Sequence, residues 1–247
     1  WPGTTMVDGA VLLPLSARTP QALTDLARSL ASHCESASST SLADLAATLA
    51  LHRSPMDLRL ALVARDLAGA REGLEAFLRQ EPRPGLVVGQ GPASSRTPVV
   101  FVFPGQGSQW VGMGRELLRS EPVFRAAMED CDAALKTFVD WSLLEVLASS
   151  DAGWLERIDV VQPALFSMQV GLARLWRSWG ITPDAVVGHG MGEVAAAHVA
   201  GALTLEDAAR IICRRSRLLL RTSGQGAMAV TELSLDEEGW RDKKHPF

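Results

Sequence analysis

The sequence predicts an α/β protein in two parts, a small α+β unit followed by a larger domain built around a parallel sheet. Three observations predict this. Short apolar runs alternate with segments whose apolar residues recur every three or four positions, as strands alternate with amphipathic helices. A turn-rich stretch, residues 82–95, separates two parts that differ in their pattern of apolar residues. Residues 184–197 have the pattern of a buried strand, a glycine-flanked turn and a helix.

The first part has a clear succession of elements. Residues 11–15 form a predicted strand, and Thr19 and Pro20 then supply an N-cap and a first helical residue. Residues 35–40 form a serine-rich loop, Ser41 caps a second helix, residues 58–64 form an apolar strand and Asp66 caps a third helix. The expected inward positions of the three helices are Leu23, Leu26, Ala27 and Leu30, then Leu42, Leu45, Ala46 and Leu49, then Leu67, Ala70, Leu74 and Phe77. Nothing here resembles an activated nucleophile or a metal site, so we expect a packing or spacer domain.

The second part has the signals of a parallel sheet with helices. Residues 99–103 form a continuous apolar run, which is typical of a strand buried on both faces. The glycine-rich residues 104–110 follow at once; their backbone N–H groups could face a ligand, and a plain tight turn is the alternative. Pro163 suits the first turn of a long helix that ends at Gly180, and Thr204 caps a helix over residues 205–220. The long helix carries Leu165, Met168, Leu172, Leu175, Trp176 and Trp179.

The turn in residues 184–197 has the layout of a nucleophile elbow, in which a sharp bend between strand and helix presents one central side chain. Gly190 occupies the central position, so the architecture is predicted and the hydroxyl is absent. Ligands of such sheets bind beyond the carboxyl ends of the strands, where Gln106 and the Gly190 turn are both expected. A dinucleotide-binding turn is a weaker alternative, because the glycine spacing is one residue short of G-x-G-x-x-G.

Composition narrows the remaining choices. The 247 residues are 47% hydrophobic and 21% charged, which is ordinary for a globular protein. The net charge of -4 gives no reason to expect nucleic acid or an anionic membrane as a partner. No apolar run is long enough to span a bilayer, and the N-terminus lacks the features of a signal peptide. The cysteines, Cys34, Cys131 and Cys213, show no metal-ligand spacing, so reduced thiols in a cytoplasmic protein without a metal are expected.

Four motifs carry a specific resemblance when taken in order. They are FPGQGSQ at residues 103–109, VQPAL at 161–165, GHGMGE at 188–193 and CRRSR at 213–217. In sequence, order and spacing they resemble the acyltransferase domain of modular polyketide synthases, and residues 12–98 are similar to the linker that precedes it. The resemblance implies a ketosynthase–acyltransferase linker domain at residues 1–97 and part of an α/β-hydrolase-like large subdomain at 98–223. Residues 224–247 would begin a ferredoxin-like small subdomain, with a first strand at 226–230, and end in a tail, 241–247, that the family does not match.

The resemblance also assigns roles to residues. Gly190 stands at the nucleophile position, and Gln106 and Met191 would offer backbone N–H groups to the oxyanion, Met191 from a helix N-terminus. Gln162, His189 and Arg215 are the substrate-binding positions: Gln162 would order the site, and Arg215 would bind the carboxylate of a malonyl-type unit. A solvated helix face is the alternative for the arginine cluster, Arg214, Arg215 and Arg217.

The family implies an enzyme that moves an extender acyl group from coenzyme A to an acyl carrier protein, beside a ketosynthase and without a cofactor. Two departures predict that this chain is inactive: the nucleophilic serine is missing, and so is the general-base histidine that the family draws from further along the chain. Of the later histidines, His198 should face away from the bend and His245 lies in the unmatched tail. Residues 157–162 are similar to the segment that accompanies methylmalonyl selection. The alternative function is a non-catalytic scaffold that docks a ketosynthase or a carrier protein.

Overall fold

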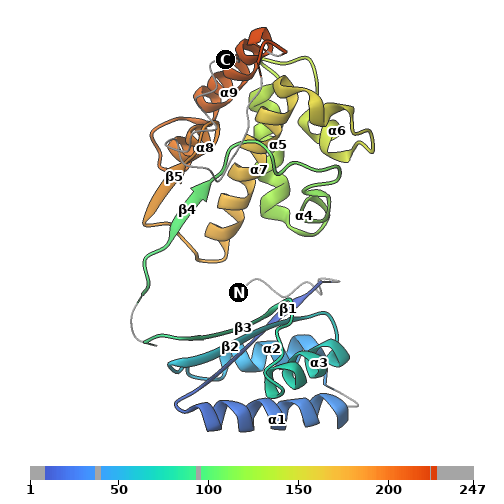
Figure 1. The fold of residues 1–247 in the computed structure, drawn as a ribbon, viewed down its shortest axis with the longest axis vertical. Helices are drawn as coiled ribbons and strands as arrows, with labels where there is room; N and C mark the ends of the chain where they lie inside the picture. Colours follow the sequence, from blue (N-terminus) through green and yellow to red (C-terminus); the bar gives the residue numbers. More distant parts are fainter. Residues whose placement is uncertain (1–8, 37–39, 93–95, 223, 227–247) are drawn as a thin grey trace, which may run out of the picture. The chain divides into compact units, whose positions relative to one another are not determined.

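The computed structural model describes residues 9–36, 40–92, 96–222 and 224–226. The contacts within it divide the chain into two compact units, Trp1–Thr97 and Pro98–Phe247. Figure 1 labels the helices and strands of both units.

The first unit is a three-stranded antiparallel sheet with its helices on one face. The strands β1 (Val11–Ala17), β2 (Leu58–Ala64) and β3 (Leu86–Gln90) pair in that order. The helices α1 (Pro20–Ser36), α2 (Leu42–Leu51) and α3 (Leu67–Leu78) lie on the same side of the sheet (Figure 1). Alternate residues of β1 and β2 face these helices and form the centre of the core: Leu13, Leu15, Leu60 and Leu62. One covered face is the usual arrangement of an antiparallel sheet.

The predicted caps begin all three helices of this unit. Thr19, Ser41 and Asp66 each accept, through a side-chain oxygen, a hydrogen bond from the backbone N–H three residues further on. Each bond satisfies a donor that the start of a helix leaves free. The starts of α1, α2 and α3 are therefore as the sequence predicts.

Two boundaries in the first unit differ from the prediction. Residues 82–95 were expected to be a linker, but β3 occupies part of them and pairs with β2 from Leu62↔Leu86 to Leu58↔Gln90. This pairing depends on a strand more than 20 residues away, which a local turn-rich pattern does not reveal. The serine-rich loop also begins later than predicted, because α1 continues to Ser36 and the hydroxyl of Ser36 donates back to the Ser32 carbonyl.

The second unit contains a two-stranded parallel sheet and a layer of helices. The strands β4 (Val100–Phe103) and β5 (Ala185–Gly188) pair from Val100↔Ala185 to Phe103↔Gly188. The predicted α/β class with a parallel sheet is confirmed. The helices, in chain order, are α4 (Arg115–Ser120), α5 (Pro122–Leu135), α6 (Leu143–Ala148), η1 (Gly153–Glu156), α7 (Ile158–Ser178), α8 (Gly192–Val199), α9 (Leu205–Leu219) and η2 (Leu220–Thr222).

Helix α7 lies at the centre of this unit, between α5 and α9 (Figure 1). Phe166 of α7, Phe124 and Met128 of α5 and Ile212 of α9 are fully buried in one core. Gly171 of α7 brings α5 close, because a Cβ at this position would stand 2.5 Å from the Met128 Cε. The long helix therefore supplies the surface on which the other helices pack.

The strand predicted at residues 99–103 is buried on one face instead of two. Phe101 and Phe103 point into the core, whereas Val100 and Val102 are 51% and 66% exposed. Val187 on β5 is 53% exposed on the same face. In the described part of the chain, helices cover only the face that holds the phenylalanines.

Helix α7 begins earlier than predicted and α9 begins where predicted. Pro163 is the sixth residue of α7, because the amides of Val160 and Val161 already bond to the Arg157 carbonyl. Gly180, at φ 82°, ends α7 as expected, and the Thr204 hydroxyl caps α9. Three of the expected apolar positions of α7 are exposed: Leu172, Trp176 and Trp179.

The predictions for the end of the chain fall largely on residues that are not described. The strand expected at residues 226–230 lies outside the described residues apart from Gly226, and so do residues 241–247 with His245. None of the helices within the described ranges has the length and apolar character needed to cross a bilayer.

Candidate active site

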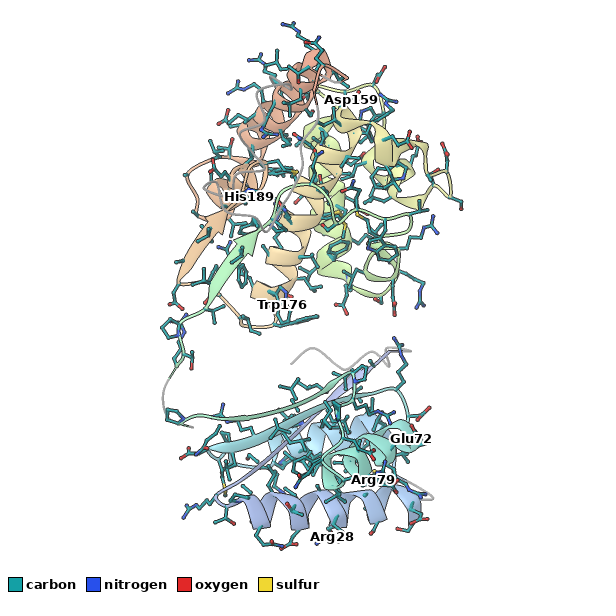
Figure 2. All side chains as sticks on the ribbon, viewed as in Figure 1. Arg28, Glu72, Arg79, Asp159, Trp176 and His189 are labelled. Atoms are coloured by element: carbon teal, nitrogen blue, oxygen red, sulfur yellow. The ribbon has the colours of Figure 1, made fainter. Side chains whose placement is uncertain are left out.

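The predicted bend is present between β5 and α8. The His189 N–H donates to the Phe103 carbonyl at 2.9 Å and so extends the pairing of β5 with β4 by one step. The Gly192 N–H then donates to the His189 carbonyl, also at 2.9 Å, which closes the turn. Figure 2 shows His189 where β5 ends and the chain turns toward α8. A strand, a sharp turn and a helix follow one another as the sequence predicts.

The flanking glycines are required by close backbone contacts. A Cβ at Gly188 would overlap the backbone of Glu193, and a Cβ at Gly192 would overlap the carbonyl of Phe103. Both neighbours are main-chain atoms that cannot move aside without shifting the strand or the helix. The bend is therefore tight because strand and helix meet without side chains between them.

Gly190 sits at the top of the bend in the left-handed region, at φ 57°. A Cβ built on it meets no atom within 4 Å in the described part of the chain. There is room for a side chain, at the backbone cost of about 1–3 kcal/mol that a non-glycine residue meets in this region. The position has the conformation of a nucleophile elbow and no atom that can act as the nucleophile.

The glycine-rich loop after β4 lies against the bend. A Cβ on Gly105 would stand 3.3 Å from the His189 Nδ1. The loop is anchored by Gln169 of α7, whose Nε2 donates to the Pro104 carbonyl at 2.7 Å. These contacts hold the loop beside the candidate nucleophile position.

Two backbone donors near the bend have no acceptor within the part of the chain that the structure describes. Neither the Gln106 nor the Met191 N–H donates to an acceptor among the described residues. Met191 is the N-cap of α8, so its N–H lies at the positive end of the helix dipole. Its side chain is buried and fixes the backbone in place. Such donors suit the negative oxygen that develops on a carbonyl under attack.

A row of hydrogen bonds joins Arg215 of α9 to this loop. The Arg215 Nη1 donates to the Gln162 Oε1 at 2.7 Å, and the Gln162 Nε2 donates to the Gln106 Oε1 at 2.9 Å. Gln162 is only 3% exposed, so its amide is a fixed link between the two. The guanidinium of Arg215 retains donors beyond the one that Gln162 uses. Three predicted site residues that are far apart in the sequence are therefore brought together.

The arginine cluster separates into three environments. Arg214 is exposed, which agrees with the alternative of a solvated helix face. Arg217 donates through Nη2 to the Phe138 carbonyl at 2.6 Å and so ties α9 to the turn that follows α5. Only Arg215 turns toward Gln162, and the solvated-face alternative does not describe it.

His198, Cys131 and Cys213 do not take part in the candidate site. The His198 Nδ1 is 3.0 Å from the Leu203 carbonyl, so His198 helps to pack the connection between α8 and α9. Burial raises the pKa of the Cys131 and Cys213 thiols to about 11, which keeps both as unreactive thiols. No cluster of three possible metal ligands occurs in the ranges that the structure describes.

No motif in the sequence indicates Gln169 as a site residue. It lies two turns after Gln162 on α7, and both glutamines bond to the loop after β4. A buried amide repeated at seven-residue spacing on an otherwise apolar helix face is the signal that could have revealed it.

Two family models match the chain. One, described as an acyl transferase domain, matches residues 100–245, and the other, described as CurL-like, PKS C-terminal, matches residues 11–74. The chain is 50% identical over 233 residues to the erythronolide synthase EryA3 of Saccharopolyspora erythraea, covering 94% of this chain and 7% of that protein. It is 49% identical over 228 residues to the polyketide synthase GfsA of Streptomyces halstedii, covering 92% of this chain and 3% of that protein.

Solved structures give the same answer for the fold. The acyltransferase domain from module 8 of the salinomycin polyketide synthase superposes with a TM-score of 0.77 at 41% identity, covering 86% of this chain and 50% of that one. The acyltransferase domain of SpnD, described in complex with 2-(pent-4-yn-1-yl)malonyl, gives a TM-score of 0.74 at 31% identity with the same coverage. The chain thus spans a small fraction of the related synthases and about half of each solved domain.

Proposed function

Because this chain belongs to the acyltransferase domain family of modular polyketide synthases, we propose that its second unit forms part of a site for malonyl-type extender groups. Such a site accepts the acyl group from coenzyme A and delivers it to an acyl carrier protein. The observation that carries the proposal is the row from Arg215 through Gln162 to Gln106, which ends beside the bend at Gly190. It provides a cation at one end and, at the other, a loop whose Gln106 N–H has no acceptor among the described residues.

Each end of the row suits one end of a malonyl thioester. The thioester carbonyl would lie over Gly190, with its oxygen facing the backbone N–H groups of Gln106 and Met191. The free carboxylate would bind Arg215, whose planar guanidinium can donate two parallel hydrogen bonds. Gln162 would act as a positioning residue. The malonyl derivative named in the SpnD complex supports this class of acyl group.

The proposal includes the inactivity of this chain. With a serine at position 190, its oxygen would attack the thioester carbonyl, the carbon–sulfur bond would break and coenzyme A would leave as the thiol. Glycine supplies neither the attacking oxygen nor the proton that the thiol must gain. Loss of a nucleophile of this kind leaves only the contribution of binding and of the oxyanion donors. The chain should therefore hold the thioester without becoming acylated.

The test is the gain of a covalent adduct on Gly190→Ser, read by intact mass after incubation with malonyl-CoA and methylmalonyl-CoA. The added hydroxyl has room, so we expect a slow adduct on the variant and none on the parent. Gly201→Ser is the matched control, because Gly201 also has a positive φ, 83°, and open space around its Cβ, but lies at the end of α8. A stable adduct on the parent chain would refute the inactivity. Equal labelling of both serine variants would show that position 190 has no special role.

The first unit gives a specific reason to keep the scaffold as a second candidate. It has its own hydrophobic core and a family match of its own, and its described residues contain no cluster of three possible metal ligands. We propose that it is a ketosynthase–acyltransferase linker. As a spacer it could dock a ketosynthase, while the candidate site of the second unit transfers no acyl group. Cross-linking to a ketosynthase or a carrier protein from the same synthase, compared with unrelated ones, tests this function. Equal cross-linking to all of them would remove it.

A further inference from the structure

The sheet of the first unit ends in a strand edge that is open to a partner. Its strand order is β1-β2-β3, so β3 has a neighbouring strand on one side only within the described part of the chain. The other outer strand, β1, contains Pro14, which has no N–H to donate. Proteins commonly place a proline or a charged side chain on an edge to prevent pairing, and β3, with the sequence LVVGQ, has neither. A further strand can therefore join β3.

The ladder between β2 and β3 determines which backbone groups of β3 point outward. At one end of the ladder the Val63 N–H donates to the Gly85 carbonyl at 2.8 Å, and at the other the Gly91 N–H donates to the Asp57 carbonyl at 3.0 Å. Backbone groups of successive residues in an antiparallel strand point to opposite sides. The odd-numbered residues from 85 to 91 therefore bond to β2, and the even-numbered ones between them point away from it.

The outward residues of β3 are Leu86, Val88 and Gln90, called here the β3 edge. The Leu86 N–H is used within the turn before the strand, where it donates to the Arg83 carbonyl at 3.1 Å. The N–H groups of Val88 and Gln90 donate to no acceptor among the described residues. The middle of the β3 edge therefore presents a donor and an acceptor on Val88, as a pairing strand requires.

Two hollows flank Val88 on the side of the sheet that the helices cover, and Val88 lines both. The first, of about 300 Å³, lies toward Gln90 and includes the apolar residues Pro20, Leu23, Leu58 and Leu78. The second, of about 400 Å³, lies toward Leu86 and includes the polar residues Gln80, Glu81 and Arg83. The β3 edge thus has an apolar recess at one end and a polar recess at the other.

We propose that the β3 edges of two copies of this chain pair antiparallel about a two-fold axis at Val88 and join their three-stranded sheets into one. In this register Val88 lies opposite Val88 of the second copy, and the two residues exchange both backbone hydrogen bonds. Leu86 lies opposite Gln90 of the second copy, and Gln90 lies opposite its Leu86. The contact is isologous, so it closes at two copies. The inference does not depend on the acyl-transfer chemistry proposed above.

The side chains of β3 are complementary to β3 itself in this register. Leu86 of the second copy comes beside the apolar hollow, and its Gln90 comes beside the polar hollow, whose side chains can bond to an amide. On the other face of the sheet, Val87 is 66% exposed and would lie opposite Gly89 of the second copy. A Cβ built on Gly89 meets no atom within 4 Å in the described residues, so there is room for the valine. A second copy therefore fits this edge along the whole strand.

The experiment is sedimentation equilibrium of this chain between about 5 µM and 1 mM. A contact one strand wide is smaller than the roughly 1,200 Å² of stable interfaces, so we expect a dimer with a Kd of roughly 100 µM. Val88→Lys should raise that Kd about tenfold or more, because it places two like charges opposite each other. Val63→Lys is the matched control, since Val63 is 48% exposed, against 54% for Val88, and lies on the central strand β2. A parent that stays monomeric, or an equal effect of the two variants, overturns the proposal.

A mixture of Val88→Lys and Val88→Glu chains tests the register. Each variant alone should be monomeric, whereas the equimolar mixture should associate at least about tenfold more tightly, because opposite charges then face each other across the two-fold axis. A mixture that associates no better than its components overturns the pairing at Val88. Both variants should melt within about 2 °C of the parent, since Val88 is exposed. A much larger decrease would show that Val88 is covered within the single chain, which also overturns the proposal.

Discussion

Replacing Gln162 by glutamate separates the positioning of Arg215 from the stability of the fold. In the structure the Gln162 amide accepts from Arg215 at 2.7 Å and donates to Gln106 at 2.9 Å. A carboxylate has the same shape and can still accept from Arg215, now as an ion pair. The exposed amide of Gln106 can turn over and donate its NH₂ to the other carboxylate oxygen. The geometry can therefore survive while the charge of Arg215 is neutralised.

The magnitudes follow from these contacts. A pair of charges in a partly buried setting gains about 4 kcal/mol at 4 Å, and burial of a carboxylate costs a comparable amount. The net change in the free energy of unfolding of Gln162→Glu should be within about 1 kcal/mol. The loss of binding free energy for a malonyl carboxylate at Arg215 should be larger. Hydrogen bonds to charged groups contribute about 1.5–3 kcal/mol each, and the new carboxylate also repels the substrate. We expect about 3 kcal/mol, or roughly 100-fold in affinity.

Calorimetric titration with malonyl-CoA and with acetyl-CoA measures this effect. Acetyl-CoA has no carboxylate, so its affinity should change by less than about threefold. Arg214→Gln is the control for charge on the same helix, because Arg214 is exposed and lies next to Arg215 in sequence. Parallel losses for both esters, or no loss for either, would refute the assignment of Gln162 as the residue that positions Arg215.

Three further predictions concern the fold around the site. Gly192→Ala should leave the second unit unfolded, as measured in a thermal scan, because the added Cβ overlaps the Phe103 carbonyl. Gly201→Ala is the control and should lower the free energy of unfolding by only about 1 kcal/mol, because Gly201 has a positive φ and open space around it. Equal melting temperatures for the two variants would contradict this. Burial raises the pKa of Asp132, but hydrogen bonds from Lys136, Ser142 and the Leu143 N–H outweigh burial and hold that pKa below its ordinary value. The stability that Asp132 contributes is therefore present above about pH 4 and is lost as the pH falls through the lowered pKa. Asp132→Asn should reduce this loss of unfolding free energy at acid pH. An Asn variant whose stability falls with pH as steeply as that of the parent would contradict this. Cys34, Cys131 and Cys213 are buried, so an aromatic disulfide reagent at about pH 8 should label them only in denaturant; rapid labelling of the native chain would contradict the packing.

Local signals predicted the elements that depend on local chemistry. The sequence predicts four helix caps, Thr19, Ser41, Asp66 and Thr204, and each one accepts the expected backbone hydrogen bond. The bend at residues 188–192 was predictable for the same reason, since only glycine fits where the strand and the helix touch. The family resemblance, which rested on four motifs in order, is confirmed by the matching family model.

Features that depend on distant partners were not predictable in this way. The strand β3 exists because it pairs with β2, and the exposure of Val100 and Val102 depends on which layers cover the sheet. Helix α4 and helix α6 have six residues each, which is too short for a helical period to appear in the sequence.

The site shows the same limit. Spacing alone did not distinguish Arg215 from Arg214, because the difference lies in a hydrogen bond to Gln162, 53 positions earlier. Only the motif match favoured Arg215. The roles of Gln106, Met191, His189 and Gly190 stay predictions.

The measurement that tests the central claim most directly is a titration of the parent chain with malonyl-CoA, followed by analysis of the recovered ester and the protein. A site that keeps its binding groups and lacks its nucleophile should bind malonyl-CoA more tightly than acetyl-CoA. The thioester should be recovered intact, with no free thiol and no gain in protein mass. Release of coenzyme A together with an acylated chain, or equal affinity for the two esters, would contradict the account.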